Sequence, residues 1–366
     1  MHTRALSRLI AGAAATLAIT AAFVQPAHAE SDDRDNPPVA QVYEATNAAA
    51  GNAIQVFERA ADGTLSVGAL VPTGGLGTGN SLASQGGVTR DGRHLLVVNG
   101  GDNTISSFVI TRNGLNLRDV EASGGVRPVS VTVNDKFVYV LNAGSDAITG
   151  FRLNERGDLK PIADSTRALS GTGTGAAQVQ FNRDGDALVV TEKATNKIDV
   201  FTVGDNGRPT GVTVTDSVGV VPYGFDIDRR DHVVVSEAAT GSVSSYQLHD
   251  GALNVVTGAL ADTQAAPCWL IVSHNGRYAF TTNAASGTIS SYRVARNGSL
   301  TLLAAVAATT GAGPTDVAQS SDGRFLYARV RNGDVAAFAV GADGSLSSLG
   351  TVTGAPSVGP SGLAAA

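Results

Sequence analysis

Short apolar runs separated by glycine- and asparagine-rich turns follow one another along the chain. One pair of apolar positions, three residues apart, recurs seven times at intervals of roughly 45 residues. The seven pairs are Ile54/Phe57, Ile105/Phe108, Ile148/Phe151, Ile198/Phe201, Val243/Tyr246, Ile289/Tyr292 and Val335/Phe338. A repeat of this length accommodates four short strands. The pattern therefore predicts seven copies of a four-stranded unit.

A glycine follows the first apolar position of every pair after eight or nine residues, usually behind Asp or Asn. Glycine supplies the positive φ that a tight hairpin needs. Helical periodicity is absent, and few aromatics with many Val, Thr and Ser favour strands. Seven such units predict an all-β protein, a seven-bladed β-propeller with four antiparallel strands in each blade.

The two ends of the repeat region predict how the ring closes. Residues 39–47 resemble the second strand of a unit, and residues 359–366 resemble a first strand. Pairing the last strand with the first removes two exposed strand edges. We therefore predict one propeller domain over residues 39–366, closed by this pairing.

Residues 1–29 have the pattern of a signal peptide. Arg4 and Arg8 precede an apolar run, and Ala27-His28-Ala29 matches a cleavage site after Ala29. Residues 30–38 are polar and predict a disordered leader. No stretch reaches the length of a membrane span. The protein is thus expected to be secreted into an extracellular setting.

The charge and the cysteine content narrow the classes of partner. The net charge is −6 at pH 7, which argues against nucleic acid as a partner. Cys268 is the only cysteine, so no internal disulfide forms, and its apolar position predicts a buried thiol. We expect a monomer that binds a small molecule or another extracellular ligand.

A resemblance to a known family predicts that this small molecule is a lactone. The repeat, the Asp-Gly-Arg turns at 91–93 and 322–324, and strands starting with Gly-Pro resemble the seven-bladed lactonase-like propellers. That group contains bacterial 6-phosphogluconolactonase and the fungal carboxymuconate lactonizing enzyme, and the resemblance implies a carboxylic ester hydrolase. Its Gly-Pro-Arg-His pattern reads Gly313-Pro314-Thr315-Asp316 here, so no family Arg or His is carried over.

Polar residues at the predicted ends of the second strands form the first candidate set. Asn is the usual residue there, as in Asn99, Asn142 and Asn283, and it caps turns through its own side chain. Glu192, Glu237 and Arg329 depart from Asn. We predict that these three residues are catalytic: Glu192 or Glu237 is the base that activates a water molecule, and Arg329 holds an anion.

The first strands supply the second candidate set. Counting from Pro or Ala at each predicted strand start, which is Ala83 in the second unit, alternate positions are small or polar and face a central channel. At its mouth we expect Gln85, Gln178, Trp269 and Asp316. The predicted substrate-binding residues are Trp269, Asp316, Gln178, Gln85, Asn142 and Asn283.

Each candidate also has an ordinary structural explanation. A Glu at a turn is commonly solvated, Asp316 and Arg329 share one blade and could pair, and Trp269 could belong to the core. The mature histidines, His94, His232, His249 and His274, fall at turns on the opposite face, where structural roles are expected. No cofactor is predicted; Ca²⁺ bound by the Asn and Glu oxygens is the alternative.

Two functions therefore remain open from the sequence. One is a secreted hydrolase that opens a lactone at one face of the disc. The other is a non-catalytic propeller that binds an extracellular ligand or protein, because a propeller scaffold does not fix its chemistry.

Overall fold

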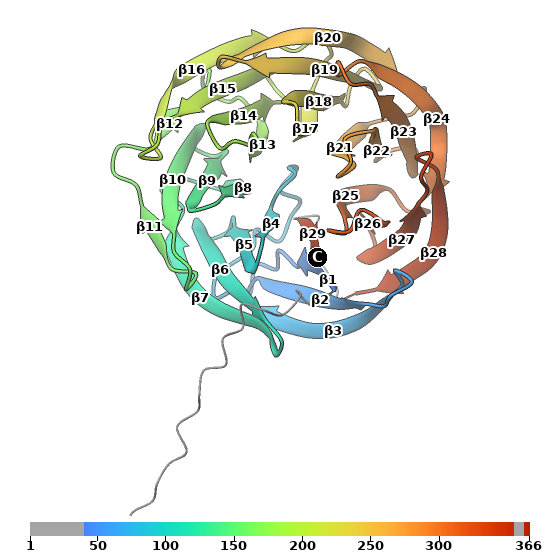
Figure 1. Ribbon diagram of the computed structural model, residues 1–366. Coiled ribbons are helices and arrows are strands. Elements are labelled where there is room, and N and C mark those ends of the chain that lie inside the picture. Colours follow the sequence, from blue (N-terminus) through green and yellow to red (C-terminus); the bar gives the residue numbers. More distant parts are fainter. Residues whose placement is uncertain (1–39, 355–361) are drawn as a thin grey trace, which may run out of the picture. The chain divides into compact units, whose positions relative to one another are not determined.

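A computed structural model describes residues 40–354 and 362–366; the predicted signal peptide and leader lie outside this part. All regular structure in it is β, arranged as seven sheets around a central channel (Figure 1). This confirms the seven-bladed propeller. Within these residues, no helix is long and apolar enough to cross a membrane.

Each blade runs from an inner strand A to an outer strand D. The A strands of blades 1 to 7 are β29 (Leu363–Ala365), β4 (Val88–Asp91), β8 (Pro128–Asn134), β13 (Ala176–Phe181), β17 (Pro222–Ile227), β21 (Pro267–Val272) and β25 (Pro314–Gln319). The B strands are β1 (Gln41–Ala45), β5 (His94–Asn99), β9 (Phe137–Asn142), β14 (Ala187–Glu192), β18 (His232–Glu237), β22 (Tyr278–Asn283) and β26 (Phe325–Val330). The C strands are β2 (Ala53–Arg59), β6 (Thr104–Thr111), β10 (Ala147–Leu153), β15 (Lys197–Val203), β19 (Ser242–His249), β23 (Thr288–Val294) and β27 (Asp334–Val340). The D strands are β3 (Leu65–Pro72), β7 (Gly114–Ala122), β11 (Leu159–Pro161) with β12 (Arg167–Ala168), β16 (Pro209–Asp216), β20 (Ala252–Ala261), β24 (Leu300–Thr309) and β28 (Leu346–Thr353).

The ring closes as the sequence predicts. β29 pairs antiparallel with β1, with Ala365 opposite Val42 and Leu363 opposite Glu44. Blade 1 is therefore built from both ends of the described chain, and its inner strand is not left as an open edge.

The recurring apolar pair lies on strand C and packs between blades. Phe57, Phe108 and Phe151 are fully buried, and the other aromatic positions of the pair are no more than 1 % exposed. Burying one such side chain contributes roughly 1.5–3 kcal/mol. The repeated pair is therefore the core of the propeller.

The turn glycine after strand C has two structural reasons. Gly63 has φ +90°, and a Cβ there would lie 2.2 Å from the Phe325 ring of blade 7. Gly344 repeats the arrangement against Tyr278 of the preceding blade. The Tyr327 hydroxyl also donates to the Gly63 carbonyl at 3.0 Å. In six blades this glycine lies against the neighbouring blade, whereas at Gly114 of blade 2 nothing lies within 4 Å of the Cβ position and only the positive φ requires glycine.

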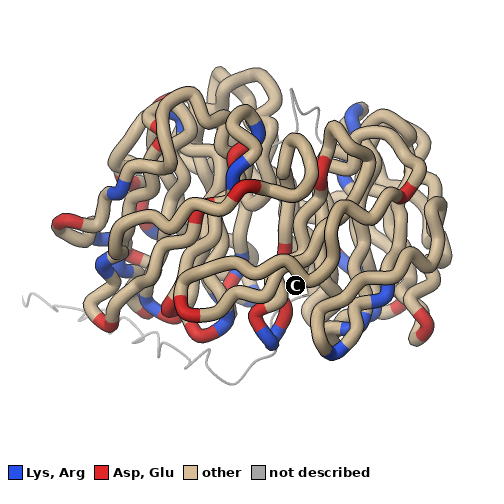
Figure 2. The backbone as a smooth tube through the Cα atoms, turned by 90° about the horizontal axis from the view of Figure 1, so that it is seen from above, with Lys and Arg blue, Asp and Glu red and all other residues tan. Residues whose placement is uncertain are grey.

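The disc has two faces, which we name by their turns. The B–C face carries the B–C turns and the D–A connections, and the A–B face carries the A–B and C–D turns. Charged positions are crowded along the A–B face, the lower rim in Figure 2. The predicted site residues Glu192 and Glu237 end B strands near the B–C face, whereas Arg329 is the residue before the last of β26, one place away from the predicted strand end.

Candidate functional site

Asparagines at the ends of B strands tie strand B to strand C. Each amide reaches a hydroxyl seven residues further along the chain: Asn99 Nδ2 donates to Ser106 Oγ at 2.7 Å, Asn142 Nδ2 to Thr149 Oγ1 at 3.3 Å, and Asn283 Nδ2 to Ser290 Oγ at 2.8 Å. All three side chains are fully buried. A buried polar group needs such partners, so this position is a structural link in these blades.

Glu237 makes the same link with reversed polarity. Its Oε1 accepts hydrogen bonds from Ser244 Oγ, seven residues on, at 2.8 Å, and from Ser217 Oγ at 2.7 Å. The side chain is fully buried, and burial raises its pKa above the usual value. Oε2 has no hydrogen bond of normal geometry to any described residue, although the Gly219 amide lies near enough to favour the ionised form.

Glu192 faces a second carboxyl group in place of the hydroxyl. The residue seven positions on is Asp199, whose pKa is raised to about 8, chiefly by burial and then by Glu192. The Ser170 backbone N–H donates to Glu192 Oε1 at 3.1 Å and to Asp199 Oδ2 at 2.9 Å. The Ser170 hydroxyl donates to Glu192 Oε2 at 2.6 Å. The two carboxyl groups therefore anchor the connection that leads into blade 4.

Arg329 is an internal ion-pair partner. Its side chain is fully buried, and Nε donates to Glu44 Oε1 of blade 1 at 2.5 Å. Nη1 donates to Thr315 Oγ1 at 2.8 Å. Arg329 thus binds Glu44 and links blades 7 and 1. The catalytic roles predicted for Glu192, Glu237 and Arg329 stay predictions; none of them lines the three cavities described below.

Trp269 is buried at the channel end near the B–C face. It is 5 % exposed, and its ring meets the Tyr223 ring edge-on at 5.2 Å between centroids. The indole Nε1–H donates to the Ser84 carbonyl at 2.8 Å. The indole belongs to blade 6. It therefore contacts the backbone that leads into blade 2, across the ring.

The residues before β4 explain this contact. We predicted that strand A of blade 2 starts at Ala83, which is wrong because β4 begins at Val88. Ala83 has φ +53° and Gly86 has φ +79°, so the backbone turns away from an extended path. Residues 82–86, the crossing segment, run across the centre of the ring (Figure 1). Gln85 binds both the N–H (3.0 Å) and the carbonyl (2.7 Å) of Leu270 in blade 6.

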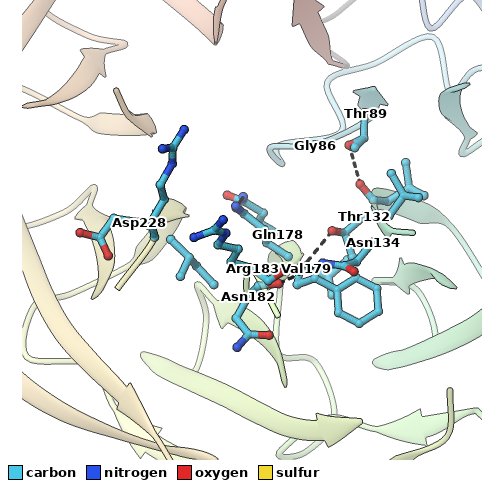
Figure 3. A pocket seen from close by; sticks show the side chains of 15 residues that line it. Gly86, Thr89, Thr132, Asn134, Gln178, Val179, Asn182, Arg183 and Asp228 are labelled. Carbon is cyan, nitrogen blue, oxygen red and sulfur yellow. Dashed lines mark hydrogen bonds between the residues drawn. The ribbon is translucent and has the colours of Figure 1, made fainter. Parts of the chain in front are cut away.

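Three neighbouring cavities lie along the channel on the A–B side of the crossing segment. The first has a volume of about 430 Å³ and is lined by A strands and A–B turns of blades 2 to 5, including Gln178, Arg183 and Asp228 (Figure 3). The second, of about 260 Å³, is lined by Gln85, Gln178 and Asp316 among others. Its neighbour, of about 220 Å³, shares residues with each. The structure thus brings together three of the predicted substrate-binding residues, and leaves Asn142, Asn283 and Trp269 outside these cavities.

Asp316 is the chemically distinctive side chain of the 260 Å³ cavity. It is 2 % exposed, and Oδ1 accepts a hydrogen bond from the Val317 amide at 2.8 Å. Oδ2 has no hydrogen bond of normal geometry to any described residue, although the Leu363 amide lies close enough to lower the pKa somewhat. Burial dominates and raises the pKa of Asp316 to about 8.

Arg90 and His274 line the same cavity and were not predicted from the sequence. The Arg90 side chain is half-buried and forms no hydrogen bond or ion pair with any described residue, and its Nε is buried. His274 Nδ1 lies 3.1 Å from the Ser321 carbonyl at the A–B face. Arg90 was missed because the alternation counted from Ala83 places it among the positions that do not face the channel.

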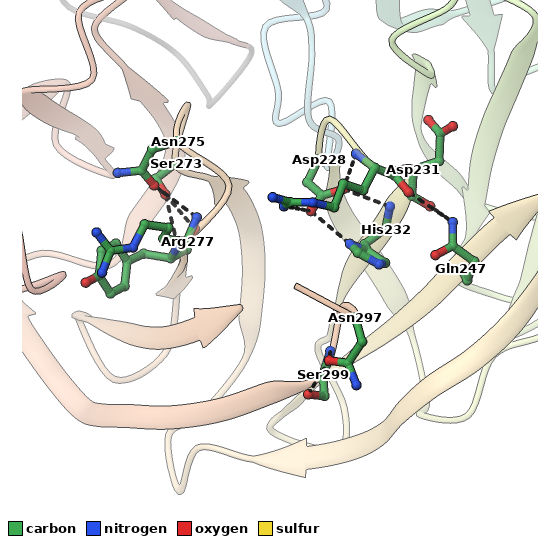
Figure 4. A network of polar contacts seen from close by, with 11 residues as sticks. Asp228, Asp231, His232, Gln247, Ser273, Asn275, Arg277, Asn297 and Ser299 are labelled. Atoms are coloured by element: carbon green, nitrogen blue, oxygen red, sulfur yellow. Dashed lines mark hydrogen bonds and ion pairs between the residues drawn. The ribbon is translucent and has the colours of Figure 1, made fainter. Parts of the chain in front are cut away.

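The A–B turns around the cavities are held by local polar contacts. Asp228 Oδ1 accepts from the His232 amide at 3.0 Å, and Oδ2 lies 2.9 Å from His232 Nδ1 (Figure 4). The His232 side chain is therefore bound to Asp228 within the turn. Cys268 is buried, as predicted, and burial raises the pKa of its thiol to about 12. Within residues 40–354 and 362–366, no three His, Cys, Asp or Glu side chains are placed to hold a metal ion, and Ca²⁺ binding itself stays untested.

Comparison with known proteins identifies the family to which this propeller belongs. The family described as "Lactonase, 7-bladed beta-propeller" matches residues 50–172, 164–252 and 232–319. The chain belongs to this lactonase family. A 6-phosphogluconolactonase of Serratia proteamaculans is 23 % identical over 156 residues, 41 % of this chain and 47 % of the relative. One from Yersinia pestis is 20 % identical over 157 residues, 42 % of this chain and 47 % of the relative. The chain thus spans about half the length of the curated relatives it matches.

Solved structures agree on the fold. The periplasmic gluconolactonase of Pseudomonas aeruginosa superposes with a TM-score of 0.70 at 18 % identity, covering 87 % of this chain and 98 % of that one. A protein from Lactobacillus plantarum gives a TM-score of 0.75 at 17 % identity, covering 90 % and 99 %. At these identities the likeness extends to the propeller alone. The fold does not determine the chemistry of this lactonase-family member, which depends on the residues of its own channel.

Proposed function

We propose that this lactonase-family propeller hydrolyses a lactone in its central channel, with Asp316 as the general base. The observation that carries the proposal is the state of Asp316: a buried carboxyl group in a cavity wall, with one oxygen lacking a normal hydrogen bond and a pKa raised to about 8. A general base works best when its pKa lies near the working pH. Buried carboxyl groups with raised pKa values are typical of functional sites.

The other side chains of the cavity fit the remaining steps. Asp316 accepts a proton from water as the water oxygen attacks the lactone carbonyl carbon. The guanidinium of Arg90, which has no partner among the described residues, stabilises the negative oxygen of the tetrahedral intermediate. The ring C–O bond then breaks, and Asp316 returns its proton to the departing alkoxide to give a hydroxy acid.

The family supports a lactone as the substrate. Its relatives include proteins named 6-phosphogluconolactonase and gluconolactonase. The pattern of residues 1–29 supports export as part of the proposal. Mass spectrometry of the protein recovered outside the cytoplasm tests that part: a chain starting at Glu30 supports export, and an intact N-terminus contradicts it.

The test of catalysis compares three carboxyl groups in one assay. Hydrolysis of a panel of sugar and aliphatic lactones is measured for the wild type and for Asp316→Asn, Glu192→Gln and Glu237→Gln, with the spontaneous rate subtracted. We expect Asp316→Asn to lower kcat/KM by about 10²–10⁴-fold. For the wild type, kcat/KM should rise with pH through about 8, because only the ionised carboxylate accepts a proton.

The two glutamate variants separate this site from the one predicted at the B–C face. They should retain kcat/KM within a few-fold as long as circular dichroism shows a folded protein. If Glu237→Gln or Glu192→Gln abolishes turnover and Asp316→Asn does not, the catalytic site is at the B–C face. Without turnover on any lactone, the non-catalytic binding propeller is the better explanation.

A further inference from the structure

The channel of this propeller is obstructed by its own chain. Most A strands run along the channel wall, but in blade 2 the crossing segment leaves the wall before β4 starts at Val88. The preceding connection, residues 73–81, contains four glycines and is among the longest between blades, so it supplies the necessary slack. Gln85 and Gly86 of the crossing segment form part of the wall of the cavity that Asp316 lines.

Polar atoms of three other blades fix the crossing segment. Ser84 Oγ donates to the Val129 carbonyl of blade 3 at 2.7 Å, and the Gln85 backbone N–H donates to the Ala177 carbonyl of blade 4 at 3.1 Å. Lys193 Nζ donates to the Ala83 carbonyl at 2.8 Å. In blade 6, the Trp269 indole donates to the Ser84 carbonyl, and the N–H and carbonyl of Leu270 bind the Gln85 side chain.

Blade 5 contributes space instead of a hydrogen bond. Gly224 lies on β17, and a Cβ at this position would lie 2.1 Å from Gln85 Oε1 and 2.6 Å from the Cys268 carbonyl oxygen of blade 6. Glycine in the interior of a strand weakens it and commonly marks a close approach of another chain segment. The absence of a side chain at Gly224 therefore leaves room both for the Gln85 side chain and for the backbone of blade 6.

We propose that the crossing segment closes the channel at the B–C face, so that ligand reaches Asp316 only from the A–B face and does not extend past Gln85. This inference deepens the proposed function and rests on it for the lactone. Gln85 lines the 260 Å³ cavity together with Asp316. A lactone bound at Asp316 can extend towards the A–B face, where the 430 Å³ cavity adjoins, but an alkyl chain that points towards the B–C face has to displace Gln85. Gln85 is therefore a specificity-determining residue.

Trp269 provides a readout of the closure that does not depend on catalysis. It is the only tryptophan of the chain, and its indole donates to the crossing segment. In Gln85→Ala, acrylamide should quench its fluorescence several-fold more efficiently than in the wild type. Gly224→Ala should act in the same direction, because its methyl group pushes against Gln85 Oε1; the methyl group also meets the Cys268 carbonyl, so Gln85→Ala is the deciding variant. Gln55→Ala is the matched control, since Gln55 is a buried glutamine bonded to three carbonyls of strands C and D of blade 1.

Hydrolysis completes the test. The ratio of kcat/KM for δ-dodecalactone to that for δ-valerolactone should rise at least five-fold in Gln85→Ala and Gly224→Ala, and stay unchanged in Gln55→Ala. Unchanged quenching in both variants overturns the closure. Increased quenching with an unchanged ratio overturns the role of Gln85 in specificity and leaves a purely structural segment. A protein that hydrolyses no lactone refutes the proposed function, while the quenching experiment still decides the closure.

Discussion

Replacing Asp316 by Asn should stabilise the protein, and the gain should grow with pH. Burial raises the pKa of Asp316 from an ordinary value of 3.8 to about 8. Between these values the folded state binds more protons than the unfolded state, so the unfolding free energy falls as pH rises. Each pKa unit corresponds to about 1.4 kcal/mol. The cost of the carboxyl group is then roughly 1.5 kcal/mol at pH 5 and on the order of 4 kcal/mol at pH 7.

Urea unfolding followed by Trp269 fluorescence at pH 5, 7 and 9 measures this difference. Asn cannot ionise, so Asp316→Asn should exceed the wild type by a margin that increases from pH 5 to 7 and levels off above 8. Asp343→Asn is the control: Asp343 lies in an exposed turn, and hydrogen bonds from Ser345 lower its pKa, so its substitution should not stabilise. A margin for Asp316→Asn that is constant across this range would refute the raised pKa, and with it the assignment of Asp316 as base.

Two further predictions concern the joint between the last and first blades. Arg329→Met should destabilise the protein by about 3–5 kcal/mol, because it leaves the Glu44 carboxylate buried without its ion pair, and Arg329→Met/Glu44→Leu should recover most of the loss; urea unfolding of both variants checks this, and equal losses would contradict it. Deleting residues 362–366 removes β29 and exposes the edge of β1, so we expect a lower and broader thermal transition; an unchanged melting curve by circular dichroism would contradict the role of this strand in closure.

The sequence predicts the architecture because its signals are local and repeated. The apolar pair on strand C and the glycine that follows it each occupy equivalent places in all seven blades. The pair packs between blades, and in six blades the glycine lies against the neighbouring blade, as Gly63 does against Phe325. Seven repetitions of one pattern average out local exceptions, so the fold, the strand order and the closure follow. The same averaging gives no information about a residue that differs in a single blade.

The candidate site was harder to predict because function depends on such single differences. Glu237 departs from Asn in sequence, yet it makes the strand B to strand C link that Asn283 makes in the next blade, with an acceptor in place of a donor. Arg90 was missed although it lines the cavity, because the alternation counted from Ala83 places it among the positions that do not face the channel. The departure in blade 2 is one of backbone path, caused by left-handed residues at Ala83 and Gly86, and residue-type alternation cannot detect it. Asp316 was found because blade 7 differs only in residue type on a strand that follows the repeat, whereas the crossing of the channel in blade 2 is a change of path, which only the structure reveals.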